Sequence, residues 1–126
     1  MQMTDGLSIE DVVIGTGEEA RAGQSLSVNF TGRLTNGQVF DTTANREGPL
    51  WFPLGQGYVI RGWDDGVPGM RVGGIRRLTV APELAYGAAG HGYMIPPGAT
   101  LMFEIELLKI NNYLKAASKQ TRRKQN

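Results

Sequence analysis

The residue types that could carry out chemistry are few in this chain. Cysteine is absent, and His91 is the single histidine among 126 residues. The absence of cysteine excludes disulfides, thiolate nucleophiles and zinc sites with sulfur ligands. One histidine with scattered carboxylates lacks the ligand spacing of a metal site, and no serine lies in a GxSxG turn. The sequence therefore predicts a function that needs no metal, cofactor or side-chain nucleophile.

Two motifs suggest other chemistry, but their contexts argue against it. Residues 15–20 match the GxGxxA variant of the dinucleotide-binding motif, which needs a helix of about ten residues after it. Gly23 and a strand pattern follow instead, so a turn is expected. Glu104 and Glu106 share one face of a predicted strand and could form a carboxylate pair. No partner residue accompanies them, so we interpret them as a solvated strand face.

Aromatic side chains are the remaining candidates for a site. Trp63 and Phe103 fit the periodicity of ordinary core residues. Phe40 precedes Asp41, a carboxylate at a strand end that by itself indicates a turn cap. Tyr86 lies before a glycine and either braces a loop or places its hydroxyl in a site. These aromatic residues could therefore form a packed core or line a pocket, and both interpretations remain.

The elements that must position these residues are mostly short strands. Alternation at period two indicates strands at residues 7–14 (weakly), 26–31, 50–54, 75–80 and 101–107. Asn36-Gly37 favours positive φ at both central turn positions, so it predicts a hairpin that returns through residues 39–41. Pro53 cannot donate to a ladder and therefore predicts an edge strand or a strand end.

Helical spacing of apolar residues occurs only over residues 58–67, and Gly66 and Pro68 limit that helix to about two turns. One short helix against several antiparallel strands predicts an α+β domain, with a hollow where the wider sheet is left uncovered. Residues 87–98 contain four glycines and two prolines. This loop is long enough for a binding role to compete with plain connection.

Length and charge indicate one domain with a distinct end. A chain of 126 residues can bury enough apolar surface to fold as a single domain. Residues 1–114 hold 8 basic and 12 acidic side chains, whereas residues 115–126 hold 5 basic and no acidic ones. We expect a folded domain over 1–114 and a basic tail over 115–126 that is disordered or a frayed helix.

The sequence predicts no membrane association. No apolar run approaches the roughly 20 residues that span a bilayer, and the first residues lack the pattern of a secretory signal. We therefore expect a cytoplasmic protein. A nuclear location is the alternative, because Arg122-Arg123-Lys124 could serve as a nuclear localisation signal.

Six motifs occur along the chain in this order: Phe40-Asp41, Val59-Ile60-Arg61-Gly62-Trp63, Ala85-Tyr86-Gly87, His91, Ile95-Pro96-Pro97 and Thr100-Leu101-Met102-Phe103. Their order and spacing resemble the FKBP-type peptidyl-prolyl cis/trans isomerases, the macrolide-binding immunophilins. The resemblance extends from about Leu7 to Ile110. It implies an FKBP-like antiparallel half-barrel of about five strands wrapped around one short helix.

The resemblance implies a role for each matching residue. It places catalytic roles on Phe40, Asp41 and Tyr86, with the Tyr86 hydroxyl and the Ile60 backbone N–H as donors to substrate carbonyls. Asp41 is expected near the imide carbonyl, and Trp63 is expected to form the floor under the proline ring. The residues implied to contact a bound proline segment or macrolide are Phe30, Arg46, Leu50, Val59, Ile60, Trp63, His91, Ile95 and Phe103.

Three positions depart from the commonest family pattern. Phe30 stands where a tyrosine is usual, Leu50 where an aromatic residue is common, and Gly92-Tyr93 where a proline-glycine pair is often found. Phe30 lacks a hydroxyl that would help to orient Asp41, and such a hydrogen bond is worth about 1 kcal/mol. We expect weaker activity and not its loss.

The implied function is prolyl isomerisation in peptides and folding proteins, by desolvation in an aromatic pocket that also binds the macrolides tacrolimus and rapamycin. A monomer without a cofactor is expected. Two alternatives remain. One is a non-catalytic binding module or holdase chaperone that uses the same groove. The other is a domain that its basic tail docks on RNA or another acidic partner.

Overall fold

Seven strands and one α-helix make up the part of the chain that the structure describes, residues 2–112, with side chains from residue 5 onward. The strands of this computed structural model are β1 (Gln2–Thr4), β2 (Leu7–Val13), β3 (Ser25–Leu34), β4 (Val39–Thr42), β5 (Leu50–Pro53), β6 (Ile75–Val80) and β7 (Leu101–Asn111). The helix is α1 (Arg61–Gly66). The predicted basic tail lies outside the described residues.

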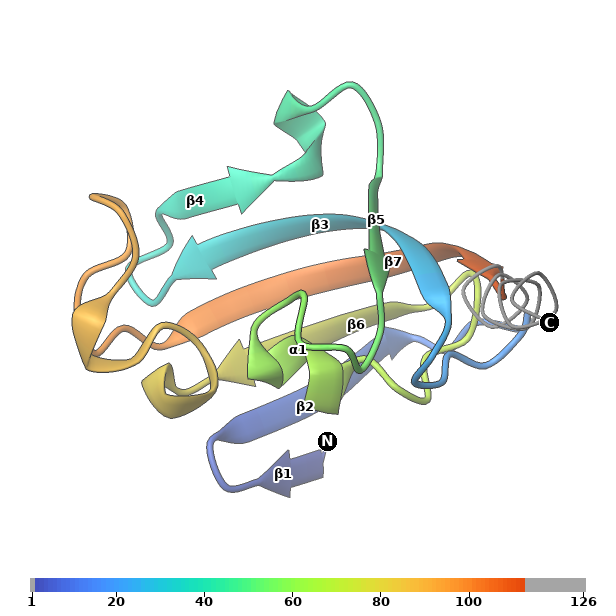
Figure 1. The fold of residues 1–126 in the computed structure, drawn as a ribbon, viewed down its shortest axis with the longest axis horizontal. Coiled ribbons are helices and arrows are strands. Elements are labelled where there is room, and N and C mark those ends of the chain that lie inside the picture. The colour runs from blue at the N-terminus through green and yellow to red at the C-terminus, as the bar shows by residue number, and fades with distance from the viewer. Residues whose placement is uncertain (1, 113–126) are drawn as a thin grey trace, which may run out of the picture.

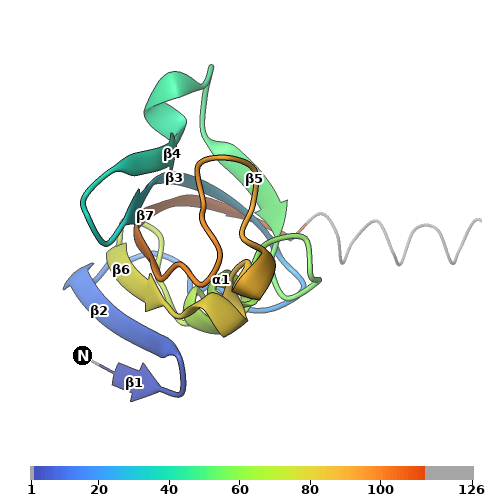
Figure 2. The same ribbon diagram turned by 90° about the vertical axis from the view of Figure 1, so that its left-hand side faces the viewer.

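The strands form one antiparallel sheet in the order β1-β2-β6-β7-β3-β4. On its free edge, β3 pairs with β5 through its first half and with β4 through its second half. The sheet curls around α1, as the end-on view shows (Figure 2). The predicted α+β class is therefore confirmed. The sheet has more strands than the resemblance implied, because the long β3 carries two short strands on one edge and β1 extends the opposite edge.

The core lies between the concave face of the sheet and α1 (Figure 1). In β7 the alternate residues Leu101, Phe103, Ile105 and Leu107 are buried, as their spacing predicts. The intervening Met102 points to the outer face and is exposed. Burying a Leu or Ile side chain stabilises a fold by about 1.5 to 3 kcal/mol. The alternating pattern of β7 therefore contributes much of the free energy that fixes its register.

A glycine lets α1 lie close to the sheet. A Cβ atom on Gly62 would lie 2.4 Å from Cγ1 of Val80 in β6, and such a contact is too short to exist. The backbone of α1 at Gly62 therefore packs directly against the side chain of Val80. Its next residue, Trp63, is then pressed into the core with only 3% of its surface exposed.

The helix begins later than the sequence predicts, at Arg61. Ile60 has extended backbone angles (φ −58°, ψ 152°), so the segment before it cannot continue the helix. The Asp64 carboxylate accepts hydrogen bonds from the backbone N–H groups of Gly55 (2.8 Å) and Gly57 (3.0 Å). These bonds hold residues 55–60 as a loop folded over the first turn of α1, where apolar spacing alone suggests a further helical turn.

Arg76 in β6 ties the far end of the helix to the sheet. Its side chain donates to both carboxylate oxygens of Asp11 in β2, at 2.7 and 3.3 Å. It also donates to the carbonyl oxygens of Gly66 (2.8 Å) and Pro68 (3.1 Å), which end the helix. Arg76 is only 8% exposed. Removing it would leave the buried carbonyl of Gly66 and the partly buried carbonyl of Pro68 without this donor.

The hairpin predicted at Asn36-Gly37 is confirmed, but its turn geometry differs from the expectation. Of the two central turn residues only Gly37 has a positive φ, of 91°. Every residue with a positive φ in the described chain is a glycine. The Asn36 side chain instead accepts a hydrogen bond from the N–H of Gln38 at 2.9 Å. Gly37 donates to the Leu34 carbonyl, and the β3–β4 register shifts between Gly32 and Arg33. This is a three-residue turn with a bulge.

The loop over residues 87–98 begins with a short 3₁₀ helix (Gly87–Ala89). Two backbone hydrogen bonds then join His91 and Ile95, so that the loop folds back on itself. Gly90 lies against this turn with φ +69°, and a Cβ there would lie 2.4 Å from the Ile95 carbonyl oxygen. None of the helices in residues 2–112 is long and apolar enough to cross a membrane.

Candidate active site

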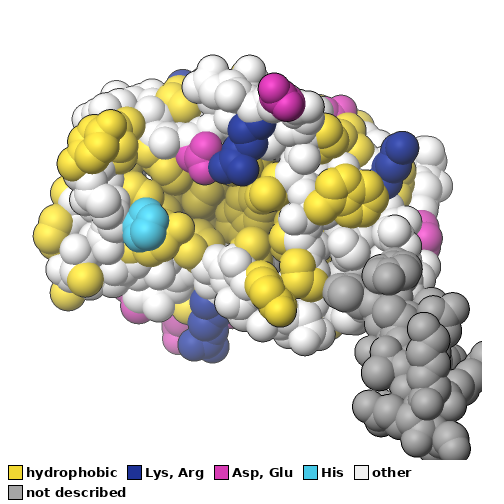
Figure 3. All heavy atoms as spheres, turned by 45° about the horizontal axis from the view of Figure 1, so that its top comes forward, with side chains coloured by type: hydrophobic (Ala, Val, Ile, Leu, Met, Phe, Trp, Pro, Cys, Tyr) yellow, Lys and Arg dark blue, Asp and Glu magenta, His cyan; other side chains and the backbone are white. Residues whose placement is uncertain are grey.

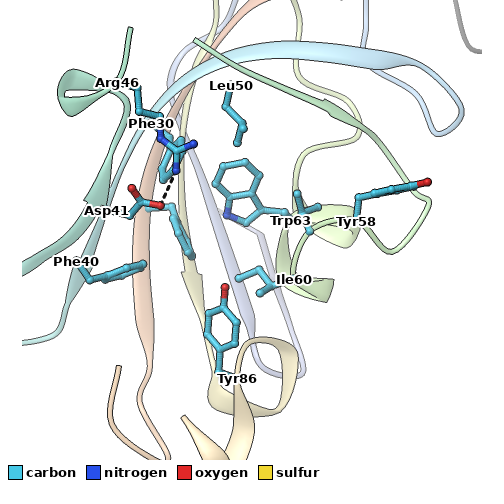
Figure 4. Close-up of a pocket in the computed structure, with 11 residues that line it drawn as sticks. Phe30, Phe40, Asp41, Arg46, Leu50, Tyr58, Ile60, Trp63 and Tyr86 are labelled. Carbon is cyan, nitrogen blue, oxygen red and sulfur yellow. Dashed lines mark hydrogen bonds and ion pairs between the residues drawn. The ribbon is translucent and has the colours of Figure 1, made fainter. Parts of the chain in front are cut away.

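A pocket with a volume of about 170 Å³ opens beside the first turn of α1. The space-filling view shows it as a hollow with an apolar interior, with a basic and an acidic side chain at its edge and the histidine nearby (Figure 3). It is lined by Phe30, Phe40, Asp41, Arg46, Leu50, Tyr58, Val59, Ile60, Trp63, Tyr86 and Phe103. These residues come from β3, β4, β5, β7, α1 and the loops between them, so the whole fold positions the pocket (Figure 4).

The floor of the pocket is the indole ring of Trp63. Three rings surround it nearly edge-on, with centroids 5.0 Å away for Phe30 and 5.3 Å away for both Phe52 and Phe103. Edge-to-face pairs of this kind each contribute about 0.5 to 1.5 kcal/mol beyond area burial. The indole N–H is buried and has no hydrogen-bond acceptor among the described residues. The floor is therefore a buried aromatic surface held by packed rings.

One wall is formed by Phe40 and Phe103, whose rings meet edge to face with centroids 5.7 Å apart. Gly32 in β3 lies behind both rings. A Cβ on Gly32 would lie 2.6 Å from Cζ of Phe40 and 3.0 Å from Cε1 of Phe103. The absence of a side chain at this position therefore lets the two rings meet.

Asp41 lies at the rim and is oriented by Arg46. Their side chains form an ion pair with Nη2 and Oδ2 2.9 Å apart, and both are half exposed. The guanidinium also lies over the ring of Phe30, 5.8 Å from its centroid. An exposed pair of this kind contributes about 0 to 1 kcal/mol to stability, so its main effect is on orientation. Arg46 thus holds the Asp41 carboxylate next to Phe30, whose ring lacks the hydroxyl of the tyrosine that is usual at this position.

Tyr86 directs its hydroxyl into the pocket from the opposite side (Figure 4). Burial, and to a smaller extent the negative charge of Asp41, raise the pKa of Tyr86 above its usual value of 10.0. The hydroxyl therefore stays protonated at neutral pH and can donate. It makes no hydrogen bond to another described residue. This group is a free donor that faces the pocket.

Ile60 contributes a second donor. It caps the N-terminus of α1, where backbone N–H groups lack partners within the helix. Its own N–H makes no hydrogen bond within residues 2–112. With the Tyr86 hydroxyl, this gives the apolar pocket two hydrogen-bond donors to which a carbonyl-bearing ligand could bind.

All but two of the residues predicted for the site line this pocket. The exceptions are His91 and Ile95. His91 is exposed and stacks on the ring of Tyr86, with centroids 4.5 Å apart and planes 17° apart. Ile95 is buried in the core cluster. Neither residue lines the empty pocket, and their contact with a bound ligand stays a prediction.

Tyr58 is the lining residue that the sequence analysis did not select. Its position directly before the Val59-Ile60 motif was the one available signal. Among residues 5–112, no three His, Asp or Glu side chains are grouped in a way that could hold a metal ion. Glu104 is exposed and forms an ion pair with Arg77, at 3.0 Å, on the outer face of the sheet.

Known proteins are similar to this chain in sequence and fold. Residues 16–108 match the model of a family described as FKBP-type peptidyl-prolyl cis-trans isomerase. An FK506-binding protein of Neisseria meningitidis serogroup B is 52% identical over 105 residues, which cover 83% of this chain and 96% of that protein. FK506-binding protein 1A of Neurospora crassa is 47% identical over 112 residues, which cover 88% of this chain and 93% of that protein.

The crystal structure of AtFKBP13 matches the fold with a TM-score of 0.79 and 44% identity, over 83% of this chain and 93% of that one. The match of the family model spans most of the chain and includes nearly all of the strands that build the pocket. This chain therefore belongs to the family of FKBP-type peptidyl-prolyl cis-trans isomerases.

Proposed function

We propose that this isomerase accelerates rotation about the bond before proline inside the ring-lined pocket, chiefly by removing that bond from water. The observation that carries the proposal is the combination of a buried aromatic floor with two free hydrogen-bond donors in one cavity. Trp63 supplies the floor, and the Tyr86 hydroxyl and the Ile60 N–H supply the donors.

The physical argument starts from the peptide bond itself. Delocalisation of the nitrogen lone pair into the carbonyl gives a rotation barrier of about 20 kcal/mol. The planar form is more dipolar than the twisted form, so water stabilises the planar ground state more strongly. Transfer into an apolar pocket therefore raises the ground state more than the transition state. The rings around Trp63 supply such surroundings.

The size of the required effect shows that desolvation acts together with other contributions. Uncatalysed prolyl isomerisation takes about 10 to 100 s. Reaching about a millisecond needs roughly a 10⁵-fold acceleration, which is about 7 kcal/mol. One neutral hydrogen bond contributes only about 1 kcal/mol. Donors placed for the twisted geometry and binding of the flanking residues must therefore add to the effect of the apolar surroundings.

In the proposed complex each polar group has a separate task. Asp41, held by Arg46, lies near the carbonyl of the residue before proline, and the Tyr86 hydroxyl donates to a substrate carbonyl. The Ile60 N–H donates to the carbonyl of proline itself. No proton is transferred in this scheme. The charges around the rotating bond therefore stay the same from the planar to the twisted form.

The same pocket is proposed to bind macrolides. The relatives from Neisseria and Neurospora are named for binding FK506, and we extend that property to this chain. A volume of about 170 Å³ is below the roughly 300 to 1,000 Å³ of sites that enclose drug-sized ligands. One ring of the macrolide would therefore occupy the pocket while the rest lies on the rim. Rapamycin should then inhibit turnover competitively.

The test removes one aromatic side chain from the pocket wall and leaves the fold intact. Phe40 is partly exposed and contacts the ring of Phe103, so Phe40→Ala should leave the core intact. We expect a strong loss of turnover, measured by NMR exchange between the cis and trans forms of a short Leu-Pro peptide. Trp51→Ala is the matched control, because Trp51 is 48% exposed and lies outside the pocket. Unchanged turnover in Phe40→Ala would remove the proposed site.

A further inference from the structure

Tyr58 extends the pocket wall outward. It lines the pocket, yet 76% of its surface is exposed, which is unusual for a large aromatic side chain. Figure 4 shows its ring beyond Ile60 and Trp63, pointing away from the pocket interior. The ring has no aromatic or cationic partner within the described residues. It therefore offers a free aromatic face next to the mouth of the pocket.

The loop that carries this ring is held in place before any ligand binds. The Asp64 carboxylate accepts from Gly55 and Gly57, at 2.8 and 3.0 Å, and both glycines have a positive φ, of 79° and 76°. Few other residues could adopt these angles. A side chain on a fixed loop loses less conformational entropy on binding than one on a mobile loop, so its contact contributes more to affinity.

The direction of the bound chain follows from the proposed roles of the polar groups. Asp41 lies across the pocket from Ile60 and Tyr58 (Figure 4). If the carbonyl before proline lies near Asp41 and the carbonyl of proline accepts from Ile60 N–H, the chain leaves the pocket on the Ile60 side. The residue after proline begins within about 3.5 Å of that carbonyl. Its side chain then lies next to Tyr58.

We infer that Tyr58 forms a subsite that selects an aromatic or large apolar side chain at the residue following proline. The inference rests on the proposed function, because it uses the same pocket and the same chain direction. A ring at that residue can stack on the Tyr58 face, whereas an alanine cannot reach it. Tyr58 is thus a specificity-determining residue for substrates of this isomerase.

The experiment compares two peptides, Leu-Pro-Phe and Leu-Pro-Ala, by NMR exchange spectroscopy. No coupling protease is used, because such a protease would itself discriminate between the two peptides. We expect kcat/KM to favour Leu-Pro-Phe by about fivefold, which is about 1 kcal/mol at 1.36 kcal/mol per tenfold. Tyr58→Ala should reduce this ratio to near one. Asp64→Ala should reduce it in part, because the loop loosens while the ring remains.

Tyr93→Ala is the matched control, since Tyr93 is 96% exposed and does not line the pocket. It should keep the wild-type ratio. Equal turnover of the two peptides by the wild type would overturn this inference and leave the proposed function standing, whereas turnover of neither would overturn both. A ratio that survives in Tyr58→Ala would also overturn it.

Discussion

Gly32→Ala is a small change that should disturb the site through its close approach to two rings, most of all to Phe40. Gly32 is buried in β3, and its φ does not lie in the left-handed region, so the backbone itself accepts alanine. The difficulty is space. The new Cβ would lie 2.6 Å from Cζ of Phe40 and 3.0 Å from Cε1 of Phe103.

The size of the effect follows from these distances. Carbon atoms pack at about 3.5 to 4.0 Å, so the Phe40 ring must move by about 1 Å. Misplacing a group by 1 Å in a site can cost about 10²-fold in rate. We expect kcat/KM to fall by about 10- to 100-fold. Overpacking should cost about 1 to 3 kcal/mol of stability, so the protein still folds.

A double-mutant cycle with Phe40→Ala isolates the mechanism. Turnover is measured by NMR exchange on a Leu-Pro peptide, and the fold is checked by urea unfolding. If Gly32→Ala acts by displacing the Phe40 ring, it should have almost no further effect once that ring is absent. Two losses that multiply would refute this reasoning, because they would show that Gly32 acts independently of Phe40.

Two further predictions concern the hydrogen bonds of Arg76 and the pH dependence of turnover. Arg76→Met should lower the free energy of unfolding in urea by about 3 kcal/mol, because Asp11 loses its partner and two buried carbonyls lose their donor; a loss below about 1 kcal/mol would show that water replaces these bonds. Burial and the charge of Asp41 raise the pKa of Tyr86 above its usual value of 10.0, so its hydroxyl stays protonated and turnover should be flat between about pH 6 and pH 9. A steep change of turnover within this range would instead show that a proton transfer takes part in the reaction.

The helix and the strands with one face on the core, β7 above all, could be predicted from the sequence. Residues 101–107 alternate strictly, and the structure places Leu101 and its alternate neighbours inside, as predicted. Pro53 is the last residue of the edge strand β5, as its missing N–H requires. Periodicity reports on burial, so it works wherever burial is one-sided.

The loops could not be predicted in the same way, because individual hydrogen bonds that leave no periodic pattern determine them. The helix starts late because Asp64 binds the N–H groups of Gly55 and Gly57, and this contact leaves no periodic signal. The Asn36 side chain replaces the expected turn geometry with its own hydrogen bond. His91 stacks on Tyr86 outside the pocket because the turn around it closes on Ile95.

The two tryptophans allow the most direct test of the claim that this pocket is where proline binds. Trp63 forms the floor, whereas Trp51 lies outside the pocket and is 48% exposed. On titration with a Leu-Pro peptide, ¹H–¹⁵N spectra should show the largest shifts at the Trp63 indole N–H and the Ile60 amide. The Trp51 indole signal should stay in place. Shifts centred on Trp51 or elsewhere, with Trp63 and Ile60 unmoved, would contradict the account.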